Sequence, residues 1–485
     1  MKLSALCGEP FDPDPIISGM TADSREVEEG YLFAALPGLE VDGAEFISQA
    51  VEKGAAAILG VPSTSASVPV IKDNEPRRRL AQLAARFYAG QPAIVAGITG
   101  TNGKTSTARF AAQLWSLLGK KAGSIGTLGA EAPGVSIKLS HTTPEPVMLH
   151  KTIQAMAQAG TDCLAMEVSS HAIAQSRADG VSFSIAAFTN ITQDHLDFHA
   201  DFDDYFDAKK KLFKDLLPSD GIAVVNADGE GASDVCALLK RRSVTTLSTG
   251  SLGKAIKLNC YTPHAGGLRL SLSVAANDNF DSVHENIDVD LPLIGYFQAE
   301  NALLAAGIVG ASGHKLSDVV PLLANLQGAP GRMEPVAEVG GAQIYVDYAH
   351  TPAAIETAIA AIRPHTEGKL IIVIGAGGDR DKEKRPLMGS AACGADKIII
   401  TDDNPRNEDR DAIRAQIRAG APGADDIGDR AKAIAHGAAM LEQGDVLLIT
   451  GKGHETGQIV GGQTFAFNDG DVARDEVAKL KAGGA

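Results

Sequence analysis

The fold of this chain is decided by one stretch, Ala93-Ile94-Val95-Ala96-Gly97-Ile98-Thr99-Gly100-Thr101-Asn102-Gly103-Lys104-Thr105. Its apolar start, residues 93–98, predicts a buried strand, and the pattern from about 105 to 118 predicts an amphipathic helix. The glycines between them let backbone N–H groups approach phosphate oxygens, while Lys104 adds a positive charge. The hydroxyl of Thr105 is placed to bind Mg²⁺. The stretch therefore predicts a nucleotide phosphate site.

This phosphate loop is a variant, because a strict loop would begin with glycine at position 98, where the chain has Ile98. The preceding strand and the Lys-Thr pair still favour phosphate binding over an ordinary glycine turn. The predicted nucleotide contacts in the loop are Gly100, Thr101, Asn102, Gly103, Lys104, Thr105 and Ser106.

Polar side chains also follow two further predicted strands. Glu167 ends the apolar run 163–168, and the segment 189–197, which contains Asp194 and His195, follows the run 184–188. Carboxyl ends of parallel strands form the ligand-binding edge of open α/β sheets. A carboxylate such as Glu167 is a hard oxygen ligand, which suits Mg²⁺. We therefore expect a metal and phosphate site at this edge.

Strand and helix patterns alternate along most of the chain, which predicts an α/β fold with mainly parallel sheets. We expect three domains: an N-terminal α/β domain (1–90), a central parallel-sheet domain like those of P-loop ATPases (91–330) and a C-terminal Rossmann-like domain (331–485). Shorter alternating runs at 255–294 favour an antiparallel addition to the central sheet. Further strands are expected at 31–36, 55–59, 222–226, 344–347, 370–374, 397–401 and 446–449.

Composition excludes several classes of protein. The 485 residues include 44 basic and 60 acidic side chains, a net charge of -16 that argues against general nucleic-acid binding. No run reaches the roughly 18 apolar residues that span a bilayer, and the N-terminus has no long apolar signal core. We expect a cytoplasmic protein without membrane insertion. The five cysteines show no CxxC spacing, which favours reduced thiols over a zinc site or disulfides.

Taken in order, the motifs resemble those of the Mur ligases, the amino-acid ligases of peptidoglycan precursor synthesis. The resemblance spans nearly the whole chain and is strongest to the member that adds the third residue of the stem peptide. Besides the phosphate loop, it is carried by residues 23–25, 167–171, 194–197, 331–334, 347–352, 377–381, 403–406 and 451–455.

The resemblance implies a reaction that uses ATP and Mg²⁺. ATP phosphorylates the D-Glu γ-carboxylate of UDP-MurNAc-L-Ala-D-Glu, the incoming amine attacks the acyl phosphate, and phosphate leaves as the amide forms. The 1–90 domain would then bind the UDP-sugar, the central domain ATP, and the last domain the amino acid. Holding two anions together requires Lys104, Mg²⁺ and oriented hydrogen-bond donors.

Family roles transfer to individual residues. Thr105, Glu167 and His195 would surround magnesium and phosphate, and Lys209 matches a lysine that is carbamylated into a magnesium ligand. Three successive lysines (209–211) leave that register open. Lys104, His195, Lys209 and His350 are the candidate catalytic residues. Asn301 matches an adenine contact, and Arg332 and Asp347 match ATP contacts from the third domain. Candidate contacts of the UDP-sugar peptide are Ser24, Thr142, Thr143, Ser169, Gln175 and Arg177.

Three loops of the C-terminal domain, at residues 377–381, 403–406 and 451–455, each follow a predicted strand. Such loops should share one crevice at the carboxyl ends of the strands. Arg380 and Arg406 would bind carboxylates bidentately, and Asp403 and Glu455 would bind ammonium groups. Asn404, Pro405 and Gly451 belong to the same loops. The resemblance of residues 403–406 to the diaminopimelate-adding enzymes predicts meso-diaminopimelate as the amine.

Other interpretations remain open. The chain could be a lysine-adding ligase of the same type, a relative of folate-polyglutamate synthase, or a regulatory P-loop ATPase that hydrolyses ATP without an amine acceptor. We expect a monomer.

Overall fold

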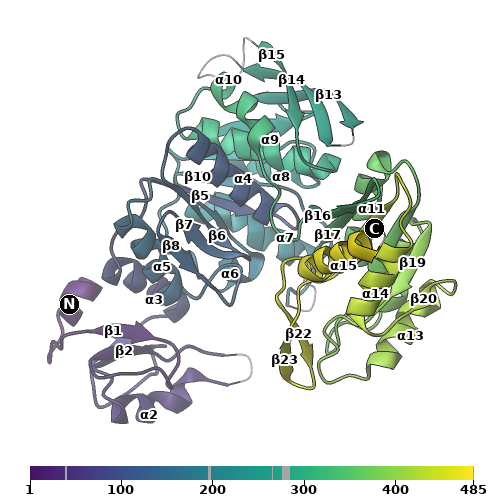
Figure 1. Cartoon of the computed structure of the whole chain (residues 1–485). Helices are drawn as coiled ribbons and strands as arrows, with labels where there is room; N and C mark the ends of the chain where they lie inside the picture. The colour runs from purple at the N-terminus through teal and green to yellow at the C-terminus, as the bar shows by residue number, and fades with distance from the viewer. Residues whose placement is uncertain (39–40, 195–197, 265, 276–283, 484–485) are drawn as a thin grey trace. The chain divides into compact units, whose positions relative to one another are not determined.

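The computed structural model describes residues 1–38, 41–194, 198–264, 266–275 and 284–483. The chain divides into two compact units, one of residues 1–258, 273–287 and 301–322 and the other of residues 259–272, 288–300 and 323–485. Within the described residues, the strands form sheets of four, eleven and six strands and one two-stranded hairpin. Each large sheet carries its own helices (Figure 1), which confirms the predicted three-part α/β architecture. The boundaries near residues 90 and 330 stay predictions.

The four-stranded sheet is parallel throughout, with the order β1-β2-β3-β4. Leu32, Leu59 and Leu80 lie in its core, where the sheet packs against α3. Pro76 opens α3 at a position where its missing N–H breaks no helical hydrogen bond. The elements are β1 (Gly19–Thr21), β2 (Tyr31–Ala34), β3 (Ala57–Gly60), β4 (Val70–Lys72), α1 (Leu3–Cys7), η1 (Gly43–Phe46), α2 (Ile47–Glu52) and α3 (Pro76–Phe87).

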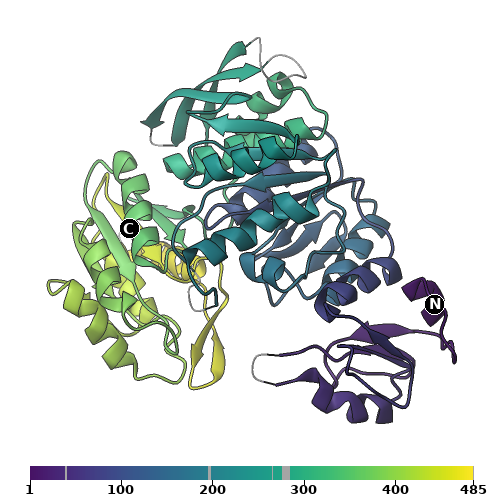
Figure 2. The same ribbon diagram turned by 180° about the vertical axis from the view of Figure 1, so that it is seen from behind.

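The eleven-stranded sheet has the order β15-β14-β13-β12-β11-β10-β5-β9-β6-β7-β8. Strands β6 and β9 to β12 pair in parallel with β5 at the centre, and helices cover both faces in opposite views (Figure 1, Figure 2). Its strands are β5 (Ile94–Thr99), β6 (Ala122–Gly126), β7 (Gly129–Ala132), β8 (Val135–Ile137), β9 (Cys163–Glu167), β10 (Ile185–Phe188), β11 (Ile222–Asn226), β12 (Thr245–Gly250), β13 (Ile256–His264), β14 (Gly267–Ala275) and β15 (His284–Leu291).

Helices connect most of the parallel strands of this sheet, whereas β12 and β13, which also pair in parallel, are joined by residues 251–255 without a helix. Helix α9 begins at Tyr296, directly after Gly295 (φ +93°), which turns the chain ahead of it. The helices are α4 (Lys104–Leu117), α5 (Pro146–Gln158), α6 (Ser170–Ala174), α7 (Phe202–Lys211), η2 (Leu212–Leu216), α8 (Ala232–Arg241), α9 (Tyr296–Ala311), α10 (Leu316–Val319) and η3 (Val320–Asn325).

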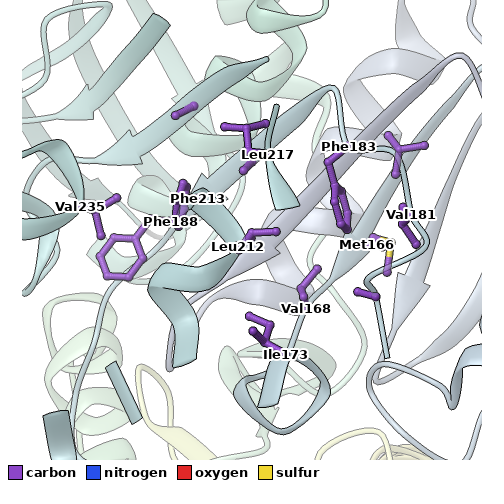
Figure 3. Packing of buried hydrophobic residues seen from close by; sticks show 14 of the residues in the cluster. Met166, Val168, Ile173, Val181, Phe183, Phe188, Leu212, Phe213, Leu217 and Val235 are labelled. Atoms are coloured by element: carbon purple, nitrogen blue, oxygen red, sulfur yellow. The ribbon is translucent and has the colours of Figure 1, made fainter. Parts of the chain in front are cut away.

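The core under the phosphate-loop edge of the sheet is closely packed. Figure 3 shows Met166 and Val168 with Phe183, and Phe188 with Phe213, all buried. Close-packed protein interiors transmit displacement instead of absorbing it. Strand ends that carry candidate site residues are therefore held on a rigid base.

The six-stranded sheet has the order β16-β17-β21-β18-β19-β20, and all its pairings are parallel except that of β16 with β17. The expected Rossmann-type sheet is thus confirmed, with an antiparallel edge strand added. Its strands are β16 (Glu334–Val339), β17 (Ala342–Asp347), β18 (Leu370–Ile374), β19 (Lys397–Ile400), β20 (Asp425–Asp426) and β21 (Val446–Thr450).

Helices and one hairpin complete this part of the chain. The hairpin of β22 (Gly457–Val460) and β23 (Gln463–Ala466) extends from the yellow C-terminal segment in Figure 1. No helix in the described part of the chain is long and apolar enough to cross a membrane. The helices are α11 (Pro352–Ile362), η4 (Arg363–His365), α12 (Lys384–Ala392), α13 (Arg410–Gly420), α14 (Arg430–Ala439) and α15 (Asp469–Gly483).

Candidate active site

The phosphate loop joins β5 to α4, and its two outer glycines are required by space and conformation. Gly100 has φ +146°, and a Cβ there would lie 2.8 Å from Asn190 O and overlap Thr189 Oγ1. Gly103 has φ +86°, and a Cβ there would overlap Asn301 Oδ1. L-residues other than glycine rarely adopt such φ values. The loop therefore keeps its backbone open at the helix N-terminus, where anions bind.

Hydrogen bonds from the end of β10 fix the middle of the loop. Thr101 N donates to Asn190 O at 2.9 Å, and Thr101 Oγ1 donates to Thr192 O at 3.1 Å. Asn102 N donates to Asn190 Oδ1 at 3.1 Å. The buried Tyr205, on α7, has its hydroxyl 3.0 Å from Thr101 Oγ1. Tyr205 was not predicted, since an isolated tyrosine on a helix carries no sequence signal for this contact.

Two lysines converge on one carbonyl of the loop. Lys104 Nζ donates to Gly100 O at 2.9 Å and to Thr101 O at 2.8 Å, while Lys209 Nζ donates to Gly100 O at 2.7 Å. Lys209 is 1% exposed and lies 4.4 Å from the centre of the Tyr205 ring. Burial, with a smaller contribution from Lys104, lowers the pKa of Lys209 well below its ordinary value. Of the three successive lysines, 209–211, only Lys209 is buried.

The predicted magnesium ligands Thr105 and Glu167 lie side by side. Thr105 Oγ1 donates to Glu167 Oε1 at 2.9 Å, and Thr127 N donates to the same oxygen at 2.8 Å. Two hard oxygen donors at the start of α4 fit Mg²⁺, which usually keeps water and phosphate oxygens as its other ligands. In the described ranges no group of three or more His, Cys, Asp and Glu side chains could hold a metal. The predicted ligand His195 lies outside the described residues.

Four of the predicted UDP-sugar contacts gather where β9 ends. Thr143 Oγ1 donates to Glu167 O at 2.8 Å and accepts from Ser169 N at 3.1 Å. Arg177 NH1 donates to Thr143 O at 2.9 Å, and its other nitrogens donate to Gln175 Oε1 at 3.0 and 2.7 Å. These polar groups share one edge of the sheet with Thr105 and Glu167, the predicted magnesium ligands.

The remaining UDP-sugar candidates have partners of their own. Thr142 Oγ1 lies 3.0 Å from Thr127 Oγ1, which places it beside Glu167. Ser24 follows β1 of the four-stranded sheet, where its hydroxyl donates to Gln49 Oε1 at 2.9 Å. Ser24 is buried, and its hydroxyl is oriented by Gln49 of α2.

The predicted ATP contacts of the third domain surround the end of β17. Asp347 accepts from Met333 N at 2.7 Å and from Ala349 N at 2.8 Å, and burial raises its pKa above the ordinary value. The Arg332 guanidinium carbon lies 4.6 Å from the centre of the Tyr348 ring, in cation–π geometry. His350 is exposed, and its Nδ1 lies 2.9 Å from Tyr348 O. Asn301, the predicted adenine contact, lies on α9 beside Gly103.

Loops after β18, β19 and β21 meet, as predicted for one crevice. Arg406 NH1 donates to Gly378 O at 2.6 Å, and Asn404 Nδ2 donates to Glu455 Oε2 at 2.9 Å. Arg406 also has φ +50°, in the left-handed region. Arg380, in the loop after β18, is exposed. Four other predicted site residues of these loops are buried: Asp403, Asn404, Pro405 and Gly451.

One member of this cluster was missed by the sequence analysis. Lys452 is 0% exposed, and its ammonium donates to Asn404 Oδ1 at 3.1 Å and to Glu455 Oε2 at 2.9 Å. The available signal was a lysine between two glycines directly after a buried strand, at the strand end where ligands bind in open α/β sheets.

The glycine phosphate loop and the threonine–glutamate oxygen pair on one sheet, with charged loops on a second, are typical of a nucleotide-dependent α/β enzyme. Family models match three consecutive segments: Mur ligase family, catalytic domain, at residues 16–88; Mur ligase middle domain at 98–309; and Mur ligase, glutamate ligase domain, at 331–453. The chain belongs to the Mur ligase family. Mur ligases are ATP-dependent amide ligases that use Mg²⁺, and the ligase reaction predicted from the sequence is thereby confirmed at the level of class.

Named relatives align with nearly the whole chain. It is 46% identical to the UDP-N-acetylmuramoyl-L-alanyl-D-glutamate--2,6-diaminopimelate ligase of Caulobacter vibrioides, covering 96% of this chain and 97% of the relative. The ligase of the same name from Bradyrhizobium diazoefficiens is 44% identical, over 99% and 100%.

Solved structures of Mur ligases also match the fold of this chain. A structure of a ligase with this name matches with a TM-score of 0.72 at 29% identity, over 99% of both chains. The MurF ligase of Thermotoga maritima in complex with ADP matches with a TM-score of 0.64 at 20% identity, over 96% and 98%, a likeness of fold alone.

Proposed function

We propose that this chain uses ATP to join meso-diaminopimelate to the D-Glu γ-carboxylate of UDP-MurNAc-L-Ala-D-Glu. The observation that supports this substrate most directly is the loop cluster after β18, β19 and β21, in which Arg406, Asp403 and Glu455 gather charges of both signs. The names of the relatives contain two of these reactants, UDP-N-acetylmuramoyl-L-alanyl-D-glutamate and 2,6-diaminopimelate.

Activation of the carboxylate is assigned to the phosphate-loop edge. A γ-carboxylate oxygen forms a bond to the γ-phosphorus of ATP as the bond to ADP breaks, which gives an acyl phosphate and ADP. The N–H groups of residues 100–105 and Lys104 hold the transferred phosphoryl group and offset its charge. Mg²⁺ held by Thr105 and Glu167 supplies further charge neutralisation when it is bound.

Amide formation then follows from the orientation of the amine. The neutral amine nitrogen attacks the acyl carbon, the C–O bond to phosphate breaks, and the nitrogen gives up a proton as inorganic phosphate leaves. Asp403 and Glu455 are assigned to the ammonium groups of the amino acid, and Arg380 and Arg406 to its carboxylates. Fixing the amine in an attack geometry is the main contribution that such loops make.

Discrimination against L-lysine is assigned to Arg406. Meso-diaminopimelate has one carboxylate more than lysine, and a partly buried arginine left without it would lose a charged hydrogen bond, about 1.5–3 kcal/mol. That corresponds to roughly tenfold to a hundredfold preference.

The polar groups at the end of β9 are assigned to the UDP-sugar peptide. Arg177, with Thr143, Ser169 and Gln175 around it, is placed for the diphosphate and peptide, and Thr142 lies beside them. Ser24, in the four-stranded sheet, is assigned to the uridine side.

Lys209 is proposed to be carbamylated, with a role at the magnesium site. Its burial and lowered pKa support this, because a neutral amine is the form that reacts with CO₂. In ¹³C-bicarbonate buffer, wild-type enzyme should show a carbamate carbon resonance that is absent in Lys209→Gln. A resonance of equal intensity in both proteins would rule out this residue.

The deciding experiment measures phosphate release with ATP, Mg²⁺ and UDP-MurNAc-L-Ala-D-Glu, adding meso-diaminopimelate, L-lysine or no amine. We expect turnover with meso-diaminopimelate, at least about tenfold less kcat/KM with lysine, and little release without an amine. Equal use of lysine would overturn the substrate, and amine-independent release would favour the regulatory ATPase.

Two further assignments accompany this function. We propose that the enzyme works as a monomer in the cytoplasm, where nucleotide-linked precursors are available. Sedimentation velocity at micromolar concentration should give a single species of the chain's mass, and fractionation of cells should place it with the cytoplasmic enzymes.

A further inference from the structure

Three buried cations lie next to the loops that are assigned to the amino acid: Lys452, Arg430 and Arg385, the last of which donates to Gly377 O at 3.1 Å and is paired with Glu408. Lys452 and Arg430 are 0% and 2% exposed. Arg430 forms a bidentate pair with the buried Asp469, at 2.6 Å for both bonds, and also donates to Thr450 O at 2.8 Å. Arg430 is paired with Asp469, whereas the ammonium group of Lys452 is bonded to side chains of the loop cluster itself.

The backbone that carries Lys452 is fixed at both ends. Arg430 holds Thr450 O at one end, and Asn468 Nδ2 donates to Glu455 O at 3.2 Å at the other. A Cβ on Gly453 (φ +54°) would lie 2.9 Å from Tyr348 Cβ, so the backbone between the two ends has little room to move. The position of Lys452 is therefore set by the backbone of its loop as well as by the hydrogen bonds of its side chain.

The ammonium group of Lys452 joins two loops that are far apart in sequence. Its partners are Asn404 Oδ1 at 3.1 Å and Glu455 Oε2 at 2.9 Å, and Asn404 Nδ2 donates to that same Glu455 oxygen at 2.9 Å. Asn404 Oδ1 also accepts from Ile459 N at 2.9 Å. The three hydrogen bonds among Lys452, Asn404 and Glu455 engage Oε2 of Glu455, which leaves Oε1 available to another donor.

The strand β22 holds the same loop from its other side. Gln458 Nε2 donates to Asp403 O at 2.7 Å, and Arg406 N donates to Ile459 O at 3.1 Å. The backbone from Asp403 to Arg406 is thus held by the hairpin, while the side chain of Asn404 is held by Lys452. A small displacement of this backbone would therefore move Asp403, Arg406 and, through Asn404, Glu455 together.

We infer that Lys452 is a positioning residue for the amino acid substrate, acting through Glu455 and Asn404 without touching the substrate. It orients Glu455 so that the free carboxylate oxygen meets the ammonium group, and it keeps the 403–406 loop in register with the 451–455 loop. The inference rests on the proposed function, since it assigns a further residue to that amino-acid site.

Lys452→Met tests this in the full-length enzyme. KM for meso-diaminopimelate should rise about tenfold to a hundredfold, the range expected when a charged hydrogen bond is lost, while KM for ATP changes less than about twofold. Lys397→Met is the matched control, because it breaks a lysine–carboxylate pair (Asp425, 2.9 Å) at the other end of β19 from Asp403. An equal rise in KM for ATP would overturn the positioning role.

A double-mutant cycle separates positioning from general loss of structure. If Lys452 acts through Glu455, adding Lys452→Met to Glu455→Gln should raise KM for the amino acid by no more than about threefold. Full additivity of the two effects would sink the inference. Lys452→Gln, which keeps a donor without the charge, gives the same cycle if the methionine variant melts below the assay temperature.

The same measurements keep the inference and the proposed function apart. Wild-type enzyme that releases phosphate with another amine but not with meso-diaminopimelate would overturn the proposed substrate. The cycle run with that amine would then decide the role of Lys452. Phosphate release that depends on no amine would overturn both.

Discussion

The phosphate loop and the loops after β18, β19 and β21 are held rigid by different means. In the phosphate loop, backbone groups form the binding surface, and Gly100 and Gly103 leave no room for a Cβ. In the loops after β19 and β21, side chains form the surface, and Lys452, Asn404 and Glu455 hold one another through hydrogen bonds. The first region requires two positions without a side chain, besides the bonds that Thr101 and Asn190 make, whereas the second is held by side chains.

This difference predicts different sensitivities. A backbone site should fail when any atom is added, whatever the chemistry of that atom. A side-chain network should fail in steps, in proportion to the bonds removed, and only for the ligand that it orients. Three substitutions test this contrast, in order of decreasing effect.

Gly100→Ala should have the largest effect. Its Cβ would overlap Thr189 Oγ1 and strain a φ of +146°, so the loop must shift. Affinity for a non-hydrolysable ATP analogue, measured by calorimetry, should fall about a hundredfold, or roughly 2–3 kcal/mol. Gly119→Ala is the control, because Gly119 has φ +80° but no atom within 4 Å of its Cβ position. Unchanged affinity in Gly100→Ala would contradict the backbone model.

Arg406→Ala should have an intermediate effect that is confined to one substrate. Its kcat/KM for meso-diaminopimelate should fall about tenfold to a hundredfold, with KM for ATP unchanged, and its preference over L-lysine should shrink. Arg418→Ala removes a more exposed arginine, 3.8 Å from Asp426, and should change neither parameter. A matching loss with both amines would show that Arg406 supports the fold and not selection.

Tyr205→Phe should have the smallest effect. It removes one hydroxyl, 3.0 Å from Thr101 Oγ1, while Thr101 keeps its bond to Thr192 O. We expect about 1 kcal/mol less unfolding free energy in urea and a kcat within about threefold of wild type. Tyr261→Phe, at a residue 44% exposed, should leave stability unchanged. A loss of ATP binding in Tyr205→Phe as large as that of Gly100→Ala would show that a side chain carries the loop.

The same contrast explains what the sequence could predict. Strands such as β11 and β18 have the predicted bounds, because continuous apolar runs between turns are a local signal. The phosphate loop is local too, since its glycines, Lys104 and Thr105 are neighbours in the chain. Loops that follow parallel strands were predicted to meet, and they do, because topology alone brings them to one edge.

What could not be predicted depends on contacts between distant residues. Asn404 and Lys452 are 48 positions apart, and no spacing rule links them. The burial of Lys209 likewise results from packing against Tyr205 and the loop, not from its place in a run of lysines. The hairpin β22–β23 did have a local signal, two short runs around Gly461-Gly462, which was not used. The roles of the site residues stay predictions.

The left-handed conformation of Arg406 has a consequence for protein engineering. A non-glycine residue at φ +50° costs about 1–2 kcal/mol, and asparagine or glycine would relieve much of that strain. If Arg406 selects the amine as proposed, a replacement that relieves this strain would raise the melting temperature and lower the preference for meso-diaminopimelate over lysine. Stability screens on this scaffold would then need a counter-selection for the choice of amine.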